Sequence, residues 1–166
     1  ASKQYTNLLL SQGIRISIEA TKTLLKNPND LDARGIIMMG ASLSTSSRIG
    51  IGKEEAYAYD IYELEFLPEK LFGSSYRRSL TSIFPRFLEA MGKRHAEDVG
   101  KYYLDVFGFD SSIEESSRKL VALFSDFGVD MYYDGIINRE QVGCIPCDTE
   151  LDENEIFEMI NGVIRK

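Results

Sequence analysis

The sequence predicts an all-α fold, a helical bundle of about seven to eight helices. Apolar residues recur at three- and four-residue spacing in almost every segment of the 166-residue chain, which is the spacing of one helix face. Alternation of apolar and polar residues, which is typical of a half-buried strand, is sustained nowhere. Glycine, proline and short polar residues stand where the apolar stripes stop, as they do at helix ends. We therefore expect little or no sheet.

The first two helices are expected on either side of the run Asn27-Pro28-Asn29-Asp30. Proline loses no hydrogen bond in the first turn of a helix, and Asn or Asp can cap that turn. The run therefore ends the first helix after Lys26 and can begin the second. The apolar stripes of the two helices are Leu10, Ile14, Ile18 and Leu25, and then Ile36, Met39 and Leu43.

The central helices are expected between Leu80 and Phe127. Pro85 lies inside the first of their stripes and should kink or restart that helix. Gly108 and Gly128 follow later stripes, as helix C-terminal glycines do. The stripes are Leu80, Ile83, Phe84, Phe87, Leu88 and Met91; Val99, Tyr102, Tyr103 and Val106; and Ile113, Leu120, Val121, Phe124 and Phe127.

Acidic and hydroxyl residues mark two helix starts. Asp110-Ser111-Ser112 precedes Ile113-Glu114-Glu115, which places acidic side chains favourably against the helix dipole. Asp152, Glu153 and Glu155 open the last helix, and Arg165-Lys166 close it. Residues 129–148, which are rich in Gly, Asp and Asn, show no period and are expected to form an irregular surface loop. The stripe of the last helix is Ile156, Met159, Ile160 and Val163.

Length and charge limit the classes of protein to consider. The chain is long enough for one buried core, so we expect a single domain over residues 1–166. Nineteen basic against 26 acidic residues give a net charge of -7, which argues against a nucleic-acid partner. No apolar run is long enough to cross a membrane, and the first twenty residues do not resemble a signal peptide. A cytoplasmic location is expected.

Two short motifs suggest chemistry that their surroundings do not support. Cys144-Ile145-Pro146-Cys147 has the spacing of a redox pair, but acidic residues follow it and no strand precedes it. An incidental thiol pair is the favoured interpretation, and zinc would need further soft ligands. Gly50-Ile51-Gly52-Lys53 is incomplete as a phosphate loop, and Glu54-Glu55 would repel phosphate, so we interpret it as a turn.

Acidic residues on a predicted helix give a weaker candidate site. Asp60 and Glu63 are three residues apart and could present two carboxylates on one face to a hard cation. A solvated acidic face is the commoner structure for such residues. His95 is the only histidine, so no site made of several histidines can form from this chain alone, and we expect His95 to be a surface residue.

A family resemblance adds to this interpretation. The run from Asn27 to Arg34, followed by Ile37-Met38 and Ala41-Ser42-Leu43, resembles the iron-containing alcohol dehydrogenases, in particular their butanol-dehydrogenase-like branch. The resemblance covers nearly the whole chain. It continues through Gly52-Lys53-Glu54-Glu55, through Glu63 and Glu65 beside the family's metal histidines, through Phe84-Pro85, and through Leu151-Asp152-Glu153-Asn154-Glu155-Ile156.

The resemblance implies that this chain is one half of a two-domain oxidoreductase. In that family an N-terminal α/β domain binds NAD(P), and a C-terminal helical domain holds iron or zinc and faces a small alcohol or aldehyde. This chain corresponds to the helical half, a fragment without the nucleotide-binding domain. The missing domain is then its partner, the chain alone is inactive, and a homodimer is a further expected partner.

The resemblance also implies where metal ligands would lie. The family's ligand histidines match Asp60 and Tyr76, and a second histidine of the same segment matches Leu64. His95 matches no ligand, so the family's shell of one carboxylate and three histidines cannot form, and this chain is expected to bind no metal. The alternative function is a non-catalytic helical binding or interaction module.

Overall fold

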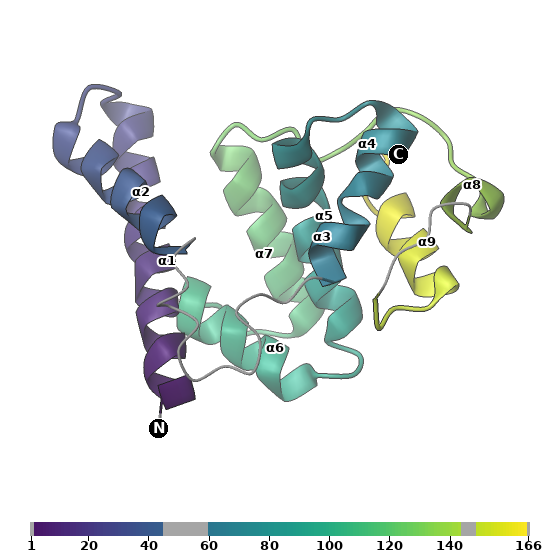
Figure 1. Cartoon of the computed structure of the whole chain (residues 1–166), viewed down its shortest axis with the longest axis horizontal. Helices are drawn as coiled ribbons and strands as arrows, with labels where there is room; N and C mark the ends of the chain where they lie inside the picture. The colour runs from purple at the N-terminus through teal and green to yellow at the C-terminus, as the bar shows by residue number, and fades with distance from the viewer. Residues whose placement is uncertain (1, 45–59, 144–148, 166) are drawn as a thin grey trace. The chain divides into compact units, whose positions relative to one another are not determined.

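The computed structural model describes residues 2–44, 60–143 and 149–165 of the chain. The regular elements in these ranges are helices, so the all-α prediction is confirmed (Figure 1). An isolated parallel bridge between Tyr133 and Ile164 is the one strand-like pairing in this part of the chain. The elements are α1 (Ser2–Lys26), α2 (Leu31–Ser44), α3 (Asp60–Leu64), α4 (Phe66–Phe72), α5 (Tyr76–Met91), α6 (Ala96–Tyr102), the π-helix η2 (Tyr103–Phe107), α7 (Ile113–Asp126), α8 (Arg139–Gly143) and α9 (Glu153–Asn161).

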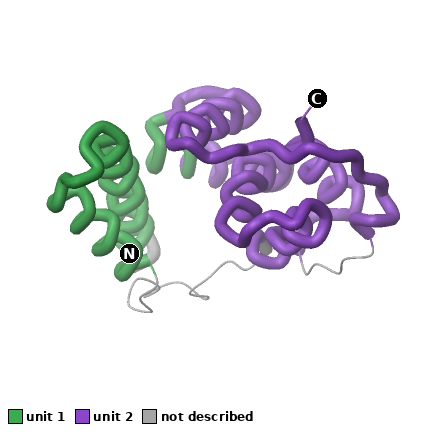
Figure 2. The backbone as a smooth tube through the Cα atoms, turned by 90° about the horizontal axis from the view of Figure 1, so that it is seen from above, with its two compact units in different colours: residues 1–58, 102–108 green, residues 59–101, 109–166 purple. Residues whose placement is uncertain are grey.

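The described residues divide into two compact units, which Figure 2 shows in different colours. One unit holds residues 2–44 and 102–108, and the other holds residues 60–101 and 109–165. The expectation of a single domain stays a prediction.

The first unit is a hairpin of α1 and α2 to which η2 is attached. The predicted break between the two helices is confirmed, because α1 ends at Lys26 and the backbone N–H of Ala33 donates to Oδ1 of Asp30 at 2.9 Å. The helices approach closely at Gly40, where an added Cβ would lie 2.8 Å from Oγ of Ser17. The guanidinium of Arg15 donates to two carbonyl oxygens of η2 and so fastens η2 to α1.

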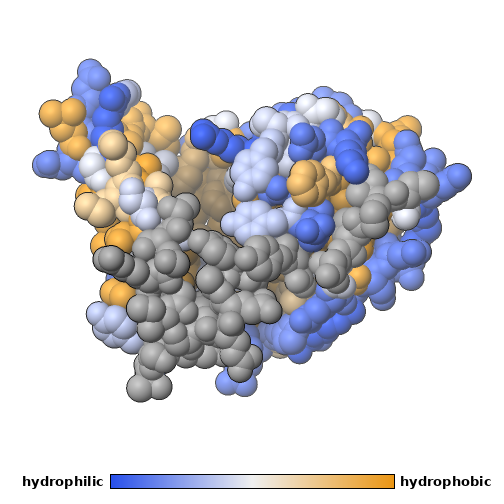
Figure 3. Space-filling model, viewed as in Figure 1, coloured by the Kyte–Doolittle hydropathy of each residue, from blue (hydrophilic) through white to orange (hydrophobic). Residues whose placement is uncertain are grey.

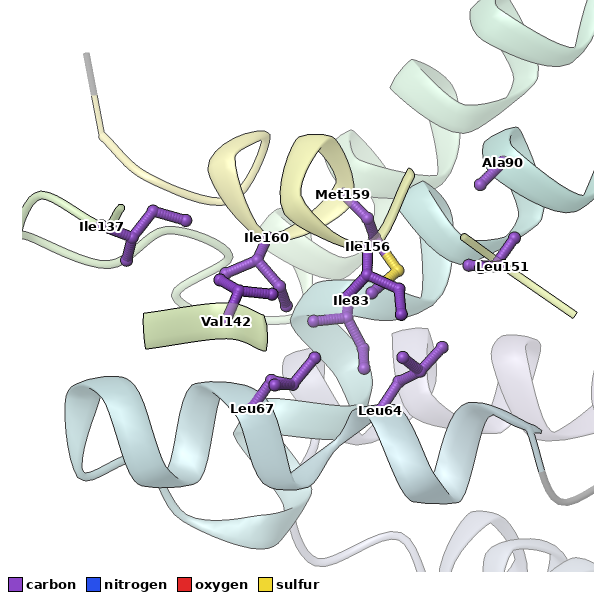
Figure 4. Close-up of a cluster of buried hydrophobic side chains, with 10 residues drawn as sticks. All are labelled: Leu64, Leu67, Ile83, Ala90, Ile137, Val142, Leu151, Ile156, Met159 and Ile160. Carbon is purple, nitrogen blue, oxygen red and sulfur yellow. The ribbon is translucent and has the colours of Figure 1, made fainter. Parts of the chain in front are cut away.

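The second unit surrounds one apolar core, which Figure 4 shows in close-up. Helix α5 packs against α3, α4, α7 and α9, so it is the central element of this unit. The buried side chains come from segments far apart in the sequence, which is what closes the unit. They are Leu64, Leu67, Ile83, Ala90, Ile137, Val142, Leu151, Ile156, Met159 and Ile160.

Helix α5 decides between two predicted effects of Pro85, and the helix ends confirm other predictions. Pro85 is buried inside α5, and the helix continues through it without a restart, so the predicted kink stays a prediction. Gly108 and Gly128 adopt positive φ angles of 72° and 84° after η2 and α7, as predicted for helix C-terminal glycines. Oγ of Ser112 accepts from the backbone N–H of Glu115 at the start of α7.

The start of α9 confirms its predicted cap, and its end does not match the prediction. Asp152 and Glu155 form a complete capping box, with each side chain bound to the other's backbone N–H. The helix ends at Asn161, so Arg165 does not close it. Arg165 instead pairs with Asp130 at 3.1 Å and with Asp134 at 3.3 Å.

The predicted irregular surface loop over residues 129–148 is wrong for its described part. Met131, Tyr133, Ile137 and Val142 are buried, and α8 lies within the segment. The backbone of Tyr133 exchanges hydrogen bonds with Val163 and Arg165 beside α9. These contacts are made across the fold and do not follow a local period, which explains why the sequence pattern does not predict them.

Candidate functional site

The candidate site lies where α3, α4 and α5 meet, because this region holds the positions that the sequence singled out. Glu65 joins α3 to α4 with a helical backbone (φ -65°, ψ -25°), and its N–H donates to the carbonyl of Ile61 at 3.1 Å. Helix α4 ends at Phe72 and is followed by Gly73, whose φ of 64° permits the left-handed turn. The chain then reverses through Ser75 and enters α5 at Tyr76.

Glu65 is the most unusual residue of this region. Its side chain is 3% exposed, and its Oε2 atom has no hydrogen-bond partner within the described residues. Burial raises the pKa of this carboxyl above its ordinary value, and the nearby carboxylates of Glu69 and Glu63 raise the pKa further. The ionised form of Glu65 is therefore less favourable here than it is in water.

Tyr76 lies within the electrostatic reach of Glu65. Loss of solvent raises the pKa of its phenol, and the charges of Glu65 and then Tyr62 add to the rise. About half of the Tyr76 side chain remains exposed, at 49%. The structure therefore brings Tyr62, Glu65 and Tyr76 into one neighbourhood, in which the carboxyl of Glu65 is buried.

A buried tyrosine from outside this region fixes the turn that presents Tyr76. The hydroxyl of Tyr133 lies 2.9 Å from Oγ of Ser74 and 2.9 Å from Oγ of Ser82. Its ring stacks on Phe72 at 4.6 Å between centroids, and Arg78 covers it at 4.4 Å. Sequence patterns missed Tyr133, because it lies in the stretch without a period.

The other predicted site residues are placed as follows. Asp60 begins α3, but its side chain lies outside the described part of the structure, so the predicted pair with Glu63 stays a prediction. Leu64, which matches a family histidine, is fully buried in the apolar core. Cys144, Cys147 and Gly50-Ile51-Gly52-Lys53 lie outside the described residues.

His95 is on the surface, as expected, and has a partner that the sequence did not indicate. Its Nε2 atom lies 2.9 Å from Oε2 of Glu150, which is 55 residues away along the chain. Beside it, Arg94 makes two hydrogen bonds to the carboxylate of Glu155, and this hydrogen bonding lowers the pKa of Glu155. These pairs join the turn after α5 to the start of α9.

The donor atoms of the α3–α5 region do not fit the metal shell that the family resemblance implies. A metal ligand must be deprotonated, and burial makes the deprotonated forms of Glu65 and Tyr76 less favourable than they are in water. Leu64 offers no donor atom. The described residues also contain no group of three or more His, Cys, Asp or Glu side chains placed to hold a metal ion.

Comparison with known families leaves the resemblance as a hypothesis. No protein-family model matches the chain, and no curated protein matches it. Within the described residues, none of the helices has the length and apolar character needed to span a membrane.

Proposed function

We propose that the chain is the helical, substrate-side domain of an oxidoreductase that resembles the iron-containing alcohol dehydrogenases. NAD(P) binds to an α/β domain outside this sequence, and the substrate is a small alcohol or aldehyde. The described residues contain no group of three or more His, Cys, Asp or Glu side chains placed to hold the iron or zinc of the family, so the proposal includes no step on a metal. The chain alone has no activity, and the proposal places the protein in the cytoplasm.

One observation carries this proposal. The resemblance matches ligand positions to Asp60 and Tyr76, which are sixteen residues apart, and the fold brings the segment after Asp60 close to Tyr76. The coupling of Tyr76 to Glu65 and Tyr62 supports this proximity. A protonated phenol can donate a hydrogen bond to the oxygen of an alcohol or aldehyde. Tyr76 is therefore the residue that we expect to orient the substrate.

The experiment compares this chain with the complete protein from which we propose it derives. NAD(P)H fluorescence should change when the nucleotide is added to the complete protein and should not change with residues 1–166 alone. With a small alcohol as substrate, Tyr76→Phe should raise KM, whereas Tyr132→Phe, a matched loss of a hydroxyl elsewhere, should not. A complete protein that binds no nicotinamide nucleotide would contradict the proposal.

The second candidate function is a non-catalytic helical binding module. The observation that favours it is Leu64, which lies where the family has a ligand histidine and is instead fully buried in the apolar core. Alcohol-dependent reduction of NAD(P)⁺ by the complete protein separates the two candidates, because only the first candidate predicts it. Stoichiometric metal together with alcohol oxidation by the complete protein would exclude the non-catalytic module.

A further inference from the structure

The second unit holds a pocket that is lined by two arginines. The pocket encloses about 450 Å³ and lies at α5 and the segment that follows α9. Its lining includes Arg86 of α5 and Gly162, Ile164 and Arg165 of that segment, and none of the lining residues within the described part of the chain is acidic. Small-molecule pockets typically measure roughly 300–1,000 Å³. Hydrophilic side chains predominate on the face of the second unit that Figure 3 shows, so the surface of this unit suits a polar ligand.

Arg86 is held in place on one side and has room on the other. Its Nη1 atom donates to Oε2 of Glu89 at 2.9 Å, and that oxygen also accepts from Oγ of the fully buried Ser117 at 3.2 Å. Its Nε and Nη2 atoms have no partner within the described residues. A Cβ added at Gly162 would lie 3.3 Å from Nε, so the glycine leaves space beside the guanidinium. A fixed guanidinium with free N–H groups is a ready donor for an anion.

Arg165 brings a second guanidinium to the same pocket. Its Nη2 atom lies 3.1 Å from Oδ1 of Asp130, and its Nε atom lies 3.3 Å from Oδ1 of Asp134. Its Nη1 atom has no partner in the part of the chain that the structure describes. The side chain of Asp134 is 85% exposed, and ion pairs at such positions are weak. Arg165 can therefore exchange Asp134 for an oxygen of a ligand at little cost.

The charges around the pocket do not repel an anion. The whole chain has a net charge of -7, but the ion pairs near the pocket join equal numbers of arginines and carboxylates. An anion that enters the pocket therefore does not meet the excess negative charge of the chain. The paired residues are Arg78, Arg86 and Arg165 with Glu89, Asp130 and Asp134.

We propose that this pocket binds the phosphate group of a small phosphate ester. The N–H groups of a guanidinium match the oxygen atoms of phosphate or carboxylate in pairs. A phosphate monoester offers three such oxygen atoms and can accept from both Arg86 and Arg165, whereas a carboxylate offers two and is matched by one guanidinium. The uncharged remainder of the lining, such as Ile164, leaves room for the organic part of the ester. The proposal does not rest on the oxidoreductase function, which concerns the α3–α5 region.

NMR titration of the ¹⁵N-labelled full chain with phenyl phosphate tests this site. The backbone amide signals of Gly162 and Ile164 should shift and saturate, with a Kd in the millimolar range or tighter. Sodium chloride at the same ionic strength should not cause these shifts, and benzoate should bind more weakly than phenyl phosphate. No saturable shift up to about 10 mM phenyl phosphate, or equal shifts with chloride, would overturn the proposal. Benzoate that binds as tightly as phenyl phosphate would overturn the assignment of the ligand as a phosphate.

Two substitutions connect the binding to the arginines. Arg86→Gln and Arg165→Gln should each weaken phenyl phosphate binding about tenfold or more, as expected for the loss of charge-assisted hydrogen bonds. Arg118→Gln removes the same charge at an exposed position of α7 outside the pocket and should bind as the wild-type chain does. Circular dichroism should show that the variants keep their helix content, and Arg165→Gln changes a side chain that is about half exposed. Wild-type affinity in the Arg165→Gln variant would overturn the proposal.

Discussion

Replacement of Glu65 by glutamine should stabilise the protein at neutral and alkaline pH. The substitution keeps the shape of the side chain and removes its ionisable group. Glu65 is almost fully buried, and Oε2 lacks a partner within the described residues, so its ionised form is held in an unfavourable place. Burial and the neighbouring carboxylates of Glu69 and Glu63 raise its pKa for the same reason.

The expected size of this effect follows from the charge alone, because the amide of glutamine leaves a polar atom without a partner as well; it is about 1.4 kcal/mol for each pH unit by which folding raises the pKa of Glu65. For a chain of this length, each kcal/mol corresponds to a shift in Tm of roughly 2–4 °C. Glu65→Gln should therefore raise the free energy of unfolding at pH 8, by about 1.4 kcal/mol for each pH unit of rise that a titration of Glu65 measures.

The effect should depend on pH in a definite direction. An acid whose pKa is raised by folding carries its cost above the folded pKa and loses that cost as the pH falls. Below the ordinary glutamate value of 4.5, the carboxyl is protonated in both states, so it no longer distinguishes them. The advantage of Glu65→Gln should therefore shrink from pH 8 to pH 4.

Urea unfolding followed by circular dichroism measures this at several pH values. Glu140→Gln, at an exposed position of α8, is the matched control and should change stability little at any pH. If Glu65→Gln destabilised the protein at pH 8, or stabilised it equally at pH 8 and pH 4, the argument from a buried carboxyl would be refuted.

Three further substitutions test individual contacts. Tyr133→Phe removes the hydroxyl that bonds two buried serines and should cost about 1–3 kcal/mol in urea unfolding, whereas Tyr132→Phe should cost little. Asp152→Ala removes the capping box of α9 and should cost about 1 kcal/mol. If the variant lost hydrogen-exchange protection along the whole of α9, a role confined to the start of the helix would be contradicted. Arg94→Gln should raise the pKa of Glu155, measured by NMR titration; an unchanged pKa would show that the ion pair does not form in solution.

Features set by neighbouring residues could be predicted from the sequence. The break after Lys26, the cap at Asp152 and the glycines at positions 108 and 128 all depend on short-range hydrogen bonds and backbone angles. Pro85 does not restart its helix, because it is buried against other helices within a continuous α5.

Features set by contacts across the fold could not be predicted in this way. Tyr133 and Ile137 are buried although their segment has no period, since the segment pairs with residues beside α9. The burial of Glu65 depends on the return of the chain from α4 into α5. Residue patterns indicated only an acidic helix at Glu65 and did not place Tyr76 nearby, whereas the family resemblance matched both residues to the surroundings of one metal site.

The gene sequence upstream of the codon for Ala1 tests the central claim most directly. We predict that the reading frame continues upstream and encodes an α/β domain that binds a nicotinamide nucleotide. A translation start immediately before Ala1, with no such domain encoded, would contradict the assignment of this chain as half of an oxidoreductase.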